Sequence, residues 1–168
     1  MRKLSKTPFL FTLILFSLQI NSSYIVTSRP TTEGTDNKVI EIFYTKTGGL
    51  AKRFDNVLAK AFSHDGKYIA IGKINIKAGK DSMKGTILIL DWSNMETLKT
   101  IITPKPVTAL EFVPKNSGYL TSNEHLSHSN FIKLWDWHNK KVIKTFKTPG
   151  GVGIKSLTLN PKASYPKK

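Results

Sequence analysis

One short segment returns at a nearly constant interval along this chain and constrains its fold more than any other feature. It begins as Val57-Leu-Ala-Lys-Ala-Phe, returns as Val107-Thr-Ala-Leu-Glu-Phe, and starts again at Ile154-Lys-Ser-Leu-Thr-Leu. Periods of this length, filled with short strands, indicate modules of about four strands each. The residues that end the three copies, spaced 50 and 47 apart, are Phe62, Phe112 and Leu159.

A second motif accompanies the first and recurs as Ile42-Phe-Tyr, Leu90-Asp-Trp and Trp135-Asp-Trp. Short apolar segments broken by turn residues fill the space between the motifs, as expected for strands. Asp65-Gly66 is predicted to close a tight hairpin, because glycine accepts a positive φ. The predicted strands are 39–45, 50–54, 57–63, 68–76, 86–92, 98–103, 107–113, 119–122, 131–137, 142–146 and 154–159.

Two of these strands are apolar along almost their whole length. They are Ile87-Leu-Ile-Leu and Phe131-Ile-Lys-Leu-Trp. A strand with one wet face should alternate between apolar and polar residues, so both faces of these strands are predicted to be covered. Stacked sheets provide such cover. The predicted fold class is all-β: a partial, open β-propeller of four-stranded antiparallel blades, preceded by an N-terminal signal helix.

The strand Phe131-Ile-Lys-Leu-Trp-Asp-Trp resembles the one that gives WD-repeat β-propellers their name. Asp91 keeps the aspartate in the preceding repeat, and Phe43 replaces it in the first. Residues 62–70 are similar to the first hairpin of the family. The resemblance covers roughly residues 39–161. It implies a structural blade signature at Phe62, Asp65, Gly66, Asp91, Trp92, Phe112, Trp135, Asp136 and Trp137.

The repeats amount to two full blades and pieces of two more, whereas closed propellers have about four to eight. Residues 24–38 are predicted to be a polar linker, 39–161 the WD-repeat-like blades, and 162–168 a basic tail at a point of truncation. A partial propeller leaves a blade face and strand edges uncovered, which favours association. We therefore expect a truncated product, a fragment, or a part that needs further blades from a longer chain or an oligomer.

The first 23 residues have the features of a secretory signal peptide. Arg2, Lys3 and Lys6 precede an apolar run over residues 9–20, and small polar residues follow it. The run is shorter than the roughly 20 residues that span a bilayer. A secreted or periplasmic location is predicted; the alternative is a membrane anchor through an uncleaved segment at residues 9–20.

The formal net charge of +15 comes almost entirely from lysine, and the three arginines are Arg2, Arg29 and Arg53. Because arginine is the better side chain for bidentate recognition of phosphates and bases, nucleic acid is not the expected partner. The chain has no cysteine, which excludes disulfides and thiol chemistry. Glu124-His125-Leu-Ser-His128 is the one cluster with metal-ligand residue types, but it falls in a predicted strand-to-strand loop, and a zinc site needs three or four ligands in a defined geometry.

No catalytic constellation is recognisable, so no enzyme, cofactor or metal is predicted. Fold alone does not fix function, but WD-repeat relatives generally bind proteins and peptides through loops, and the resemblance implies the same here. The expected function is a non-catalytic protein-interaction platform, exported, with an acidic protein as its partner. The alternatives are a propeller subunit or remnant of a secreted enzyme, and polyanion or nucleic-acid binding. The predicted contact residues, on loops at one end of the blades, are Lys73, Lys77, Lys80, Lys84, Lys105, His125 and His128.

Overall fold

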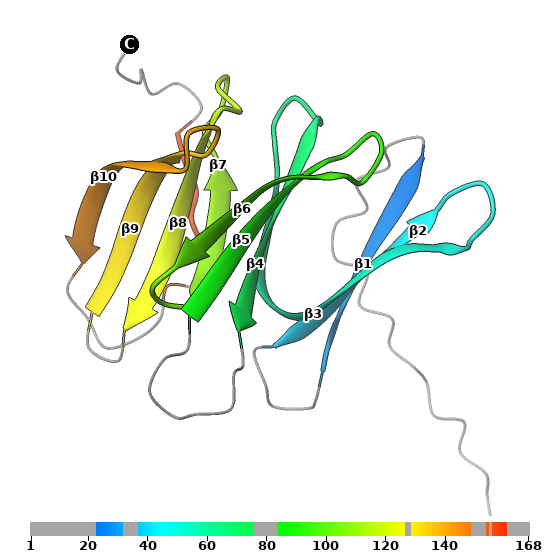
Figure 1. Cartoon of the computed structure of the whole chain (residues 1–168), viewed down its shortest axis with the longest axis horizontal. Helices are drawn as coiled ribbons and strands as arrows, with labels where there is room; N and C mark the ends of the chain where they lie inside the picture. Colours follow the sequence, from blue (N-terminus) through cyan, green and yellow to red (C-terminus); the bar gives the residue numbers. More distant parts are fainter. Residues whose placement is uncertain are drawn as a thin grey trace, which may run out of the picture.

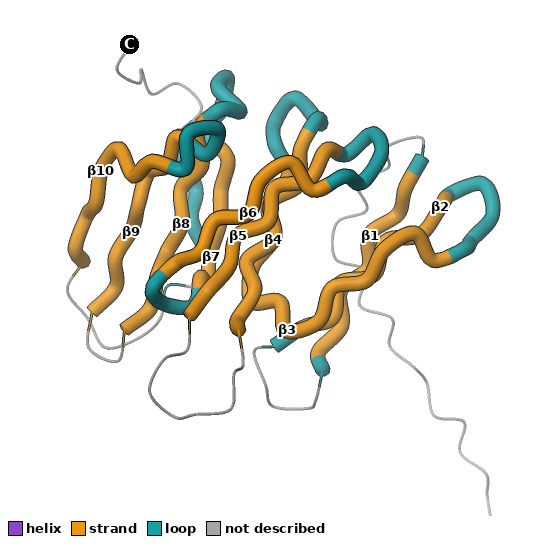
Figure 2. Tube along the Cα trace, viewed as in Figure 1, coloured by secondary structure: helices purple, strands orange, loops and turns teal. Residues whose placement is uncertain are grey.

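The computed structural model describes residues 23–31, 37–75, 84–126, 129–148, 154 and 156–160. Within these residues it contains strands and loops only, which confirms the all-β prediction (Figure 2). The predicted signal peptide, apart from Ser23, and the predicted basic tail lie outside them. The strands are β1 (Tyr24–Pro30), β2 (Lys38–Tyr44), β3 (Leu50–Phe62), β4 (Tyr68–Asn75), β5 (Lys84–Asp91), β6 (Thr97–Thr103), β7 (Val107–Phe112), β8 (Tyr119–Leu126), β9 (Ser129–Asp136) and β10 (Lys141–Thr148).

The strands form two antiparallel sheets, one in the order β1 to β6 and the other in the order β10-β9-β8-β7 (Figure 1). β3 is 13 residues long; its first part pairs with β2 and its second part with β4. Asn56 has a φ of 58° and the register shifts beside it, so the strand bends there. The segments 50–54 and 57–63, predicted as two strands, are therefore one strand shared between two blades.

We define three blades from this topology. Blade 1 is β1, β2 and the first part of β3; blade 2 is the rest of β3 with β4, β5 and β6; blade 3 is β7 to β10. The link from blade 2 to blade 3 runs through Pro104-Lys105-Pro106, where both prolines lack the N–H that a strand needs. The ladder therefore stops, and β7 starts a new sheet packed against β3 and β4.

Blade 2 is buried on both faces. Ile69 and Leu90 belong to the apolar layer shared with blade 1. Ile87 and Ile89 belong to the layer shared with blade 3. All four side chains are 0% exposed. Burial of each such side chain contributes roughly 1.5–3 kcal/mol, and the prediction that the Ile87–Leu90 run is covered on both sides is confirmed. The same prediction for the Phe131–Trp135 run is wrong for one face, where Ile132 and Leu134 are only half-buried.

An aromatic contact is repeated at both seams between blades. Trp92 of blade 2 meets Tyr24 of blade 1 with ring centroids 5.5 Å apart. Trp137 of blade 3 meets Tyr68 of blade 2 at 5.2 Å. Both pairs are edge-to-face, an arrangement that adds about 0.5–1.5 kcal/mol beyond the buried area. Trp135 lies in the same layer as Trp137, and its indole Nε1 donates to Ser122 Oγ at 2.8 Å.

The predicted linker over residues 24–38 is wrong in its first half. Residues 24–30 form β1, which pairs with β2 along its whole length. The position of β1 matches that of the second strand in the other blades. Each of these strands begins with a tyrosine opposite the last residue of the third strand, and the three tyrosines are Tyr24, Tyr68 and Tyr119. The segment looks polar because only Tyr24 among its residues is buried. At the other end of the chain, the predicted strand over 154–159 is not formed by the described residues there.

In the structure, the first copy of the second motif is aligned one residue later in the chain than the sequence analysis placed it. Tyr44, and not Phe43, occupies the position of Asp91 and Asp136. The evidence is the turn that follows: Gly48, Met95 and Lys140, each four residues after those positions, have φ of 67°, 62° and 54°. Tyr44 and Asp91 also pair with the equivalent residues of the second strand. Because side chains alternate between faces, a one-residue slip in register exchanges the two faces of the strand.

Gly85 holds the blade 2 to blade 3 link against β5, and we predict that Gly85→Ala destabilises the fold. A Cβ at this position would collide with Thr103 Oγ1 and the backbone oxygen of Lys105. We expect the free energy of unfolding to fall by about 1–3 kcal/mol, measured by urea denaturation. Gly49→Ala is the control, because its Cβ would meet only the Thr47 hydroxyl, at 3.3 Å. Equal stability of the two variants would contradict the role of Gly85.

Candidate functional site

The second strands end and the third strands begin at one end of the sheets, where the link from β6 to β7 also lies, and we name this end the loop face (Figure 1). Lys73 is near the end of β4, Lys84 is at the start of β5, and Lys105 is in the blade 2 to blade 3 link. The predicted residues Lys77, Lys80 and His128 lie outside the described residues. For His125 the structure describes only the backbone, at the loop-face end of β8.

The scaffold fixes these three lysines at their backbones. Lys73 pairs with Thr86 across β4 and β5, and Lys84 pairs with Asn75. The link is anchored by the fully buried Thr103, whose hydroxyl donates to the backbone oxygen of Lys105 at 2.7 Å. Lys84 is exposed, and Lys73 and Lys105 are half-buried. The arrangement presents three cationic side chains from separate segments on one rigid edge.

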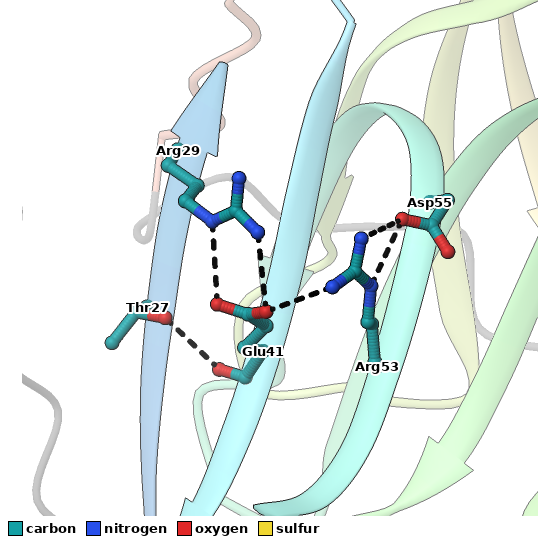
Figure 3. Close-up of polar contacts among 5 residues, drawn as sticks. All are labelled: Thr27, Arg29, Glu41, Arg53 and Asp55. Carbon is teal, nitrogen blue, oxygen red and sulfur yellow. Dashed lines mark hydrogen bonds and ion pairs between the residues drawn. The ribbon is translucent and has the colours of Figure 1, made fainter. Parts of the chain in front are cut away.

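A network of four charged side chains lies on blade 1 and was not anticipated from the sequence (Figure 3). Glu41 accepts from Arg29 Nε and Nη2, at 3.4 Å each, and from Arg53 Nη1 at 3.3 Å. Arg53 also donates to Asp55 Oδ1 from Nη2 at 2.9 Å. The hydrogen bond that Arg53 donates to Asp55 is the main cause that raises the pKa of Arg53 above its ordinary value. Two positive and two negative charges balance within this network.

Glu124, the first residue of the predicted metal-ligand cluster, points inward. Its carboxylate is 2% exposed, and Lys133 Nζ lies 2.8 Å from it. An ion pair this buried is costly to break, because removal of one partner leaves an uncompensated charge. Glu124 is therefore part of the packing of blade 3. The described residues contain no group of three or more His, Cys, Asp or Glu side chains that could hold a metal ion.

At the opposite end of the blades, which we name the turn face, polar side chains of blades 2 and 3 are hydrogen-bonded to each other. Asp65 accepts from Ser63 Oγ at 2.6 Å within its own turn and from Ser117 Oγ of blade 3 at 2.9 Å. Burial would raise the pKa of Asp65, but the hydrogen bonds from Ser63, the Lys67 backbone and Ser117 outweigh it and hold the pKa below its ordinary value. The predicted signature residues Asp65 and Gly66 thus close a tight turn, with Gly66 at φ 69°.

Comparison with known proteins places the fold. No protein-family model matches the chain, and no curated protein does. Among solved structures, an acylaminoacyl peptidase in complex with Z-Gly-Gly-Phe-chloromethyl ketone matches with a TM-score of 0.52 and 16% identity, over 75% of this chain and 23% of that one. The β-propeller domain of the Trilobed protease from Pyrococcus furiosus matches with a TM-score of 0.50 and 19% identity, over 75% and 39%. The fold is a partial β-propeller.

These similarities show only the fold of the chain. The acylaminoacyl peptidase of Pyrococcus horikoshii gives the same result, with a TM-score of 0.51 and 16% identity. This chain spans 23% of each of the two peptidase chains and 39% of the Trilobed protease chain. In the part of the chain that the structure describes, no helix is long and apolar enough to cross a membrane.

The low pKa of Asp65 predicts acid sensitivity of the seam between blades 2 and 3. A carboxyl group whose folded-state pKa lies below its unfolded value, about 3.9, stabilises the fold above that pH and loses this effect as the pH falls through the folded value. We expect the stability of the chain to decline as the pH falls below about 5, and to decline less steeply in Asp65→Asn. Urea denaturation across this range measures it, with Ser117→Ala as an intermediate case. Identical pH profiles for Asp65→Asn and the parent chain would contradict the assignment.

Proposed function

We propose that this chain is a non-catalytic platform that binds an acidic protein partner through its loop face. The observation that carries the proposal is the convergence of Lys73, Lys84 and Lys105 from three segments at one end of blade 2. Loops presented together by a rigid scaffold are where binding residues gather. The proposal includes export, on the signal-like residues 1–23, and kinship with WD-repeat proteins, on the resemblance of the blade motifs.

The charge of the chain supports an anionic partner. Lysine and arginine number 26 against 11 acidic residues. In the described residues both arginines are bonded to carboxylates, so the unbalanced positive charge resides on lysines. A lysine is a strongly hydrated point charge on a flexible stem, which suits salt-sensitive attraction to carboxylates better than geometric reading of nucleic-acid bases. An acidic protein therefore fits the loop face better than a nucleic acid.

A second candidate is a propeller part of a larger exported enzyme. The similarity to propellers of the acylaminoacyl peptidase and the Trilobed protease favours it. In this role the chain would position or admit a substrate for chemistry performed elsewhere. An assay of peptide hydrolysis by the 168-residue chain separates the two candidates, since turnover would contradict a purely non-catalytic platform.

We predict that Lys73→Gln, Lys84→Gln and Lys105→Gln together weaken binding to poly-L-glutamate. Each exposed charge pair contributes roughly 0.2–1 kcal/mol, so the triple variant should lose about tenfold in affinity. The loss should shrink as salt is raised, because salt screens exposed charges. Titration of labelled poly-L-glutamate at several salt concentrations measures both effects.

The matched control removes the same charge from the turn face, through Lys67→Gln, Lys115→Gln and Lys140→Gln. All three lysines are exposed there. If both triple variants weaken binding equally, the attraction is a property of the net charge, and the loop face is not the site. Tighter binding to single-stranded oligodeoxythymidine than to poly-L-glutamate would favour the nucleic-acid alternative.

A further inference from the structure

β1 has one strand edge that no described strand covers. It is the terminal strand of its sheet and pairs only with β2. Thr45 N donates to Ser23 O at 3.1 Å and Thr31 N donates to Asn37 O at 3.0 Å. Residues of β1 alternate between its two edges, so the backbone groups of Tyr24, Val26 and Ser28 point to the open side. Among the described strands, β1 holds the place of a second strand with no first strand beside it.

The chain carries a surplus copy of the first-strand motif at its other end. The motif of β3 and β7 begins a third time at Ile154, whose backbone oxygen accepts from Thr108 Oγ1 of β7 at 2.9 Å. Beyond it, Leu157 and Leu159 are half-buried and Thr158 is exposed, the alternation of a strand with one covered face. Blade 1 lacks the strand type that this segment supplies.

The strand registers of blades 2 and 3 predict how residues 156–159 would pair with β1. Phe62 lies opposite Ile69 in blade 2, and Phe112 lies opposite Leu120 in blade 3. Ile69 and Leu120 each follow a tyrosine, as Ile25 does in β1, so Ile25 is their equivalent. Leu159 ends the repeated motif in the same way as Phe62 and Phe112. Leu159 therefore fits opposite Ile25, and Leu157 opposite Thr27.

The outer face of blade 3 is partly exposed, although the equivalent face of blade 2 is buried. Its residues Ile132, Leu134 and Phe146 hold the positions that Ile87, Ile89 and Ile101 hold in blade 2. The blade 2 residues are 0%, 0% and 3% exposed, because blade 3 packs on them. Ile132 and Leu134 are only half-buried, and Phe146 is 44% exposed. Apolar residues in this array require a neighbouring blade.

The outer face of blade 1 offers the matching surface. Ile25 and Phe43 are half-buried there, at the positions of Leu120 and Trp135, which are the blade 3 residues packed on blade 2. The rest of this face carries the Arg29–Glu41–Arg53 network. Its charges are already hydrogen-bonded to one another, which limits the cost of covering them.

We propose that two copies of this chain close head to tail into one six-bladed ring, in which residues 156–159 of each copy add as the first strand of the other's blade 1. The number of copies follows from the blades. Three blades fall short of the four to eight of closed propellers, two copies give six, and three copies would exceed the range. Closed rotational symmetry is the usual state of such assemblies. This ring does not depend on an acidic partner.

The strand exchange is tested by disulfide formation between two single-cysteine chains, Thr27→Cys and Leu157→Cys. The chain has no other cysteine. Directly opposed residues in a non-hydrogen-bonded pair have Cα atoms about 4.5 Å apart, within disulfide range. We expect the oxidised mixture to give a linked dimer of twice the 18.8 kDa chain mass. Ser28→Cys mixed with Leu157→Cys is the control, because a shift of one residue turns the thiol to the other face. No linked dimer, or equal yield in the control, would overturn the proposal.

Light scattering on the 168-residue chain tests the ring without cross-linking. We expect twice the chain mass for the parent and a shift to single-chain mass for Phe146→Lys. Ile102→Lys is the matched control, because Ile102 is 59% exposed on a blade that already has both neighbours. A parent chain at single-chain mass at all concentrations tested, or a dimer undisturbed by Phe146→Lys, would overturn the ring.

Discussion

The enclosure of blade 2 between two apolar layers is the interaction on which the rest of the structure depends. A four-stranded sheet has two faces and cannot hide either of them by itself. Here consecutive residues such as Ile89 and Leu90 belong to different layers, so each strand stabilises both seams at once. Blades 1 and 3 are therefore oriented by alternate side chains of the same strands.

The two ends of the blades differ in chemistry because different connections emerge there. The turn face holds tight turns whose polar groups are satisfied internally, as in the hydrogen bonds from Ser63 and Ser117 to Asp65. The loop face holds the proline-bounded link, and its lysines Lys73, Lys84 and Lys105 are exposed or half-buried on segments whose backbones are held in place.

The repeat period was sufficient to predict the blades, since each blade needs the same buried positions. It predicted that Trp135 and Trp137 are packed and that the Ile87–Leu90 strand is covered twice. It could not predict β1, because the apolar residues of this strand stop at Val26 and residues 27–30 are exposed. It misplaced the register of blade 1 because Tyr44 replaces the aspartate that marks the other two copies.

The charged network on blade 1 was beyond sequence reasoning for a geometric reason. Glu41 lies 12 residues from each of its two arginines, a spacing that has no meaning until β1, β2 and β3 are placed side by side. The lysines of the loop face could be grouped in advance, because a propeller sends all its second loops to one end. Their surroundings could not, since these depend on the bond from Thr103 and on the bare glycine at position 85.

The bent strand β3 has a mechanical consequence. Its backbone is continuous from blade 1 into blade 2, so the two blades share one uninterrupted hydrogen-bonded sheet. The proline-bounded link into β7 has no ladder, so blade 3 is joined to them by packing and by the covalent chain. We therefore expect blades 1 and 2 to open as one cooperative unit and blade 3 as another.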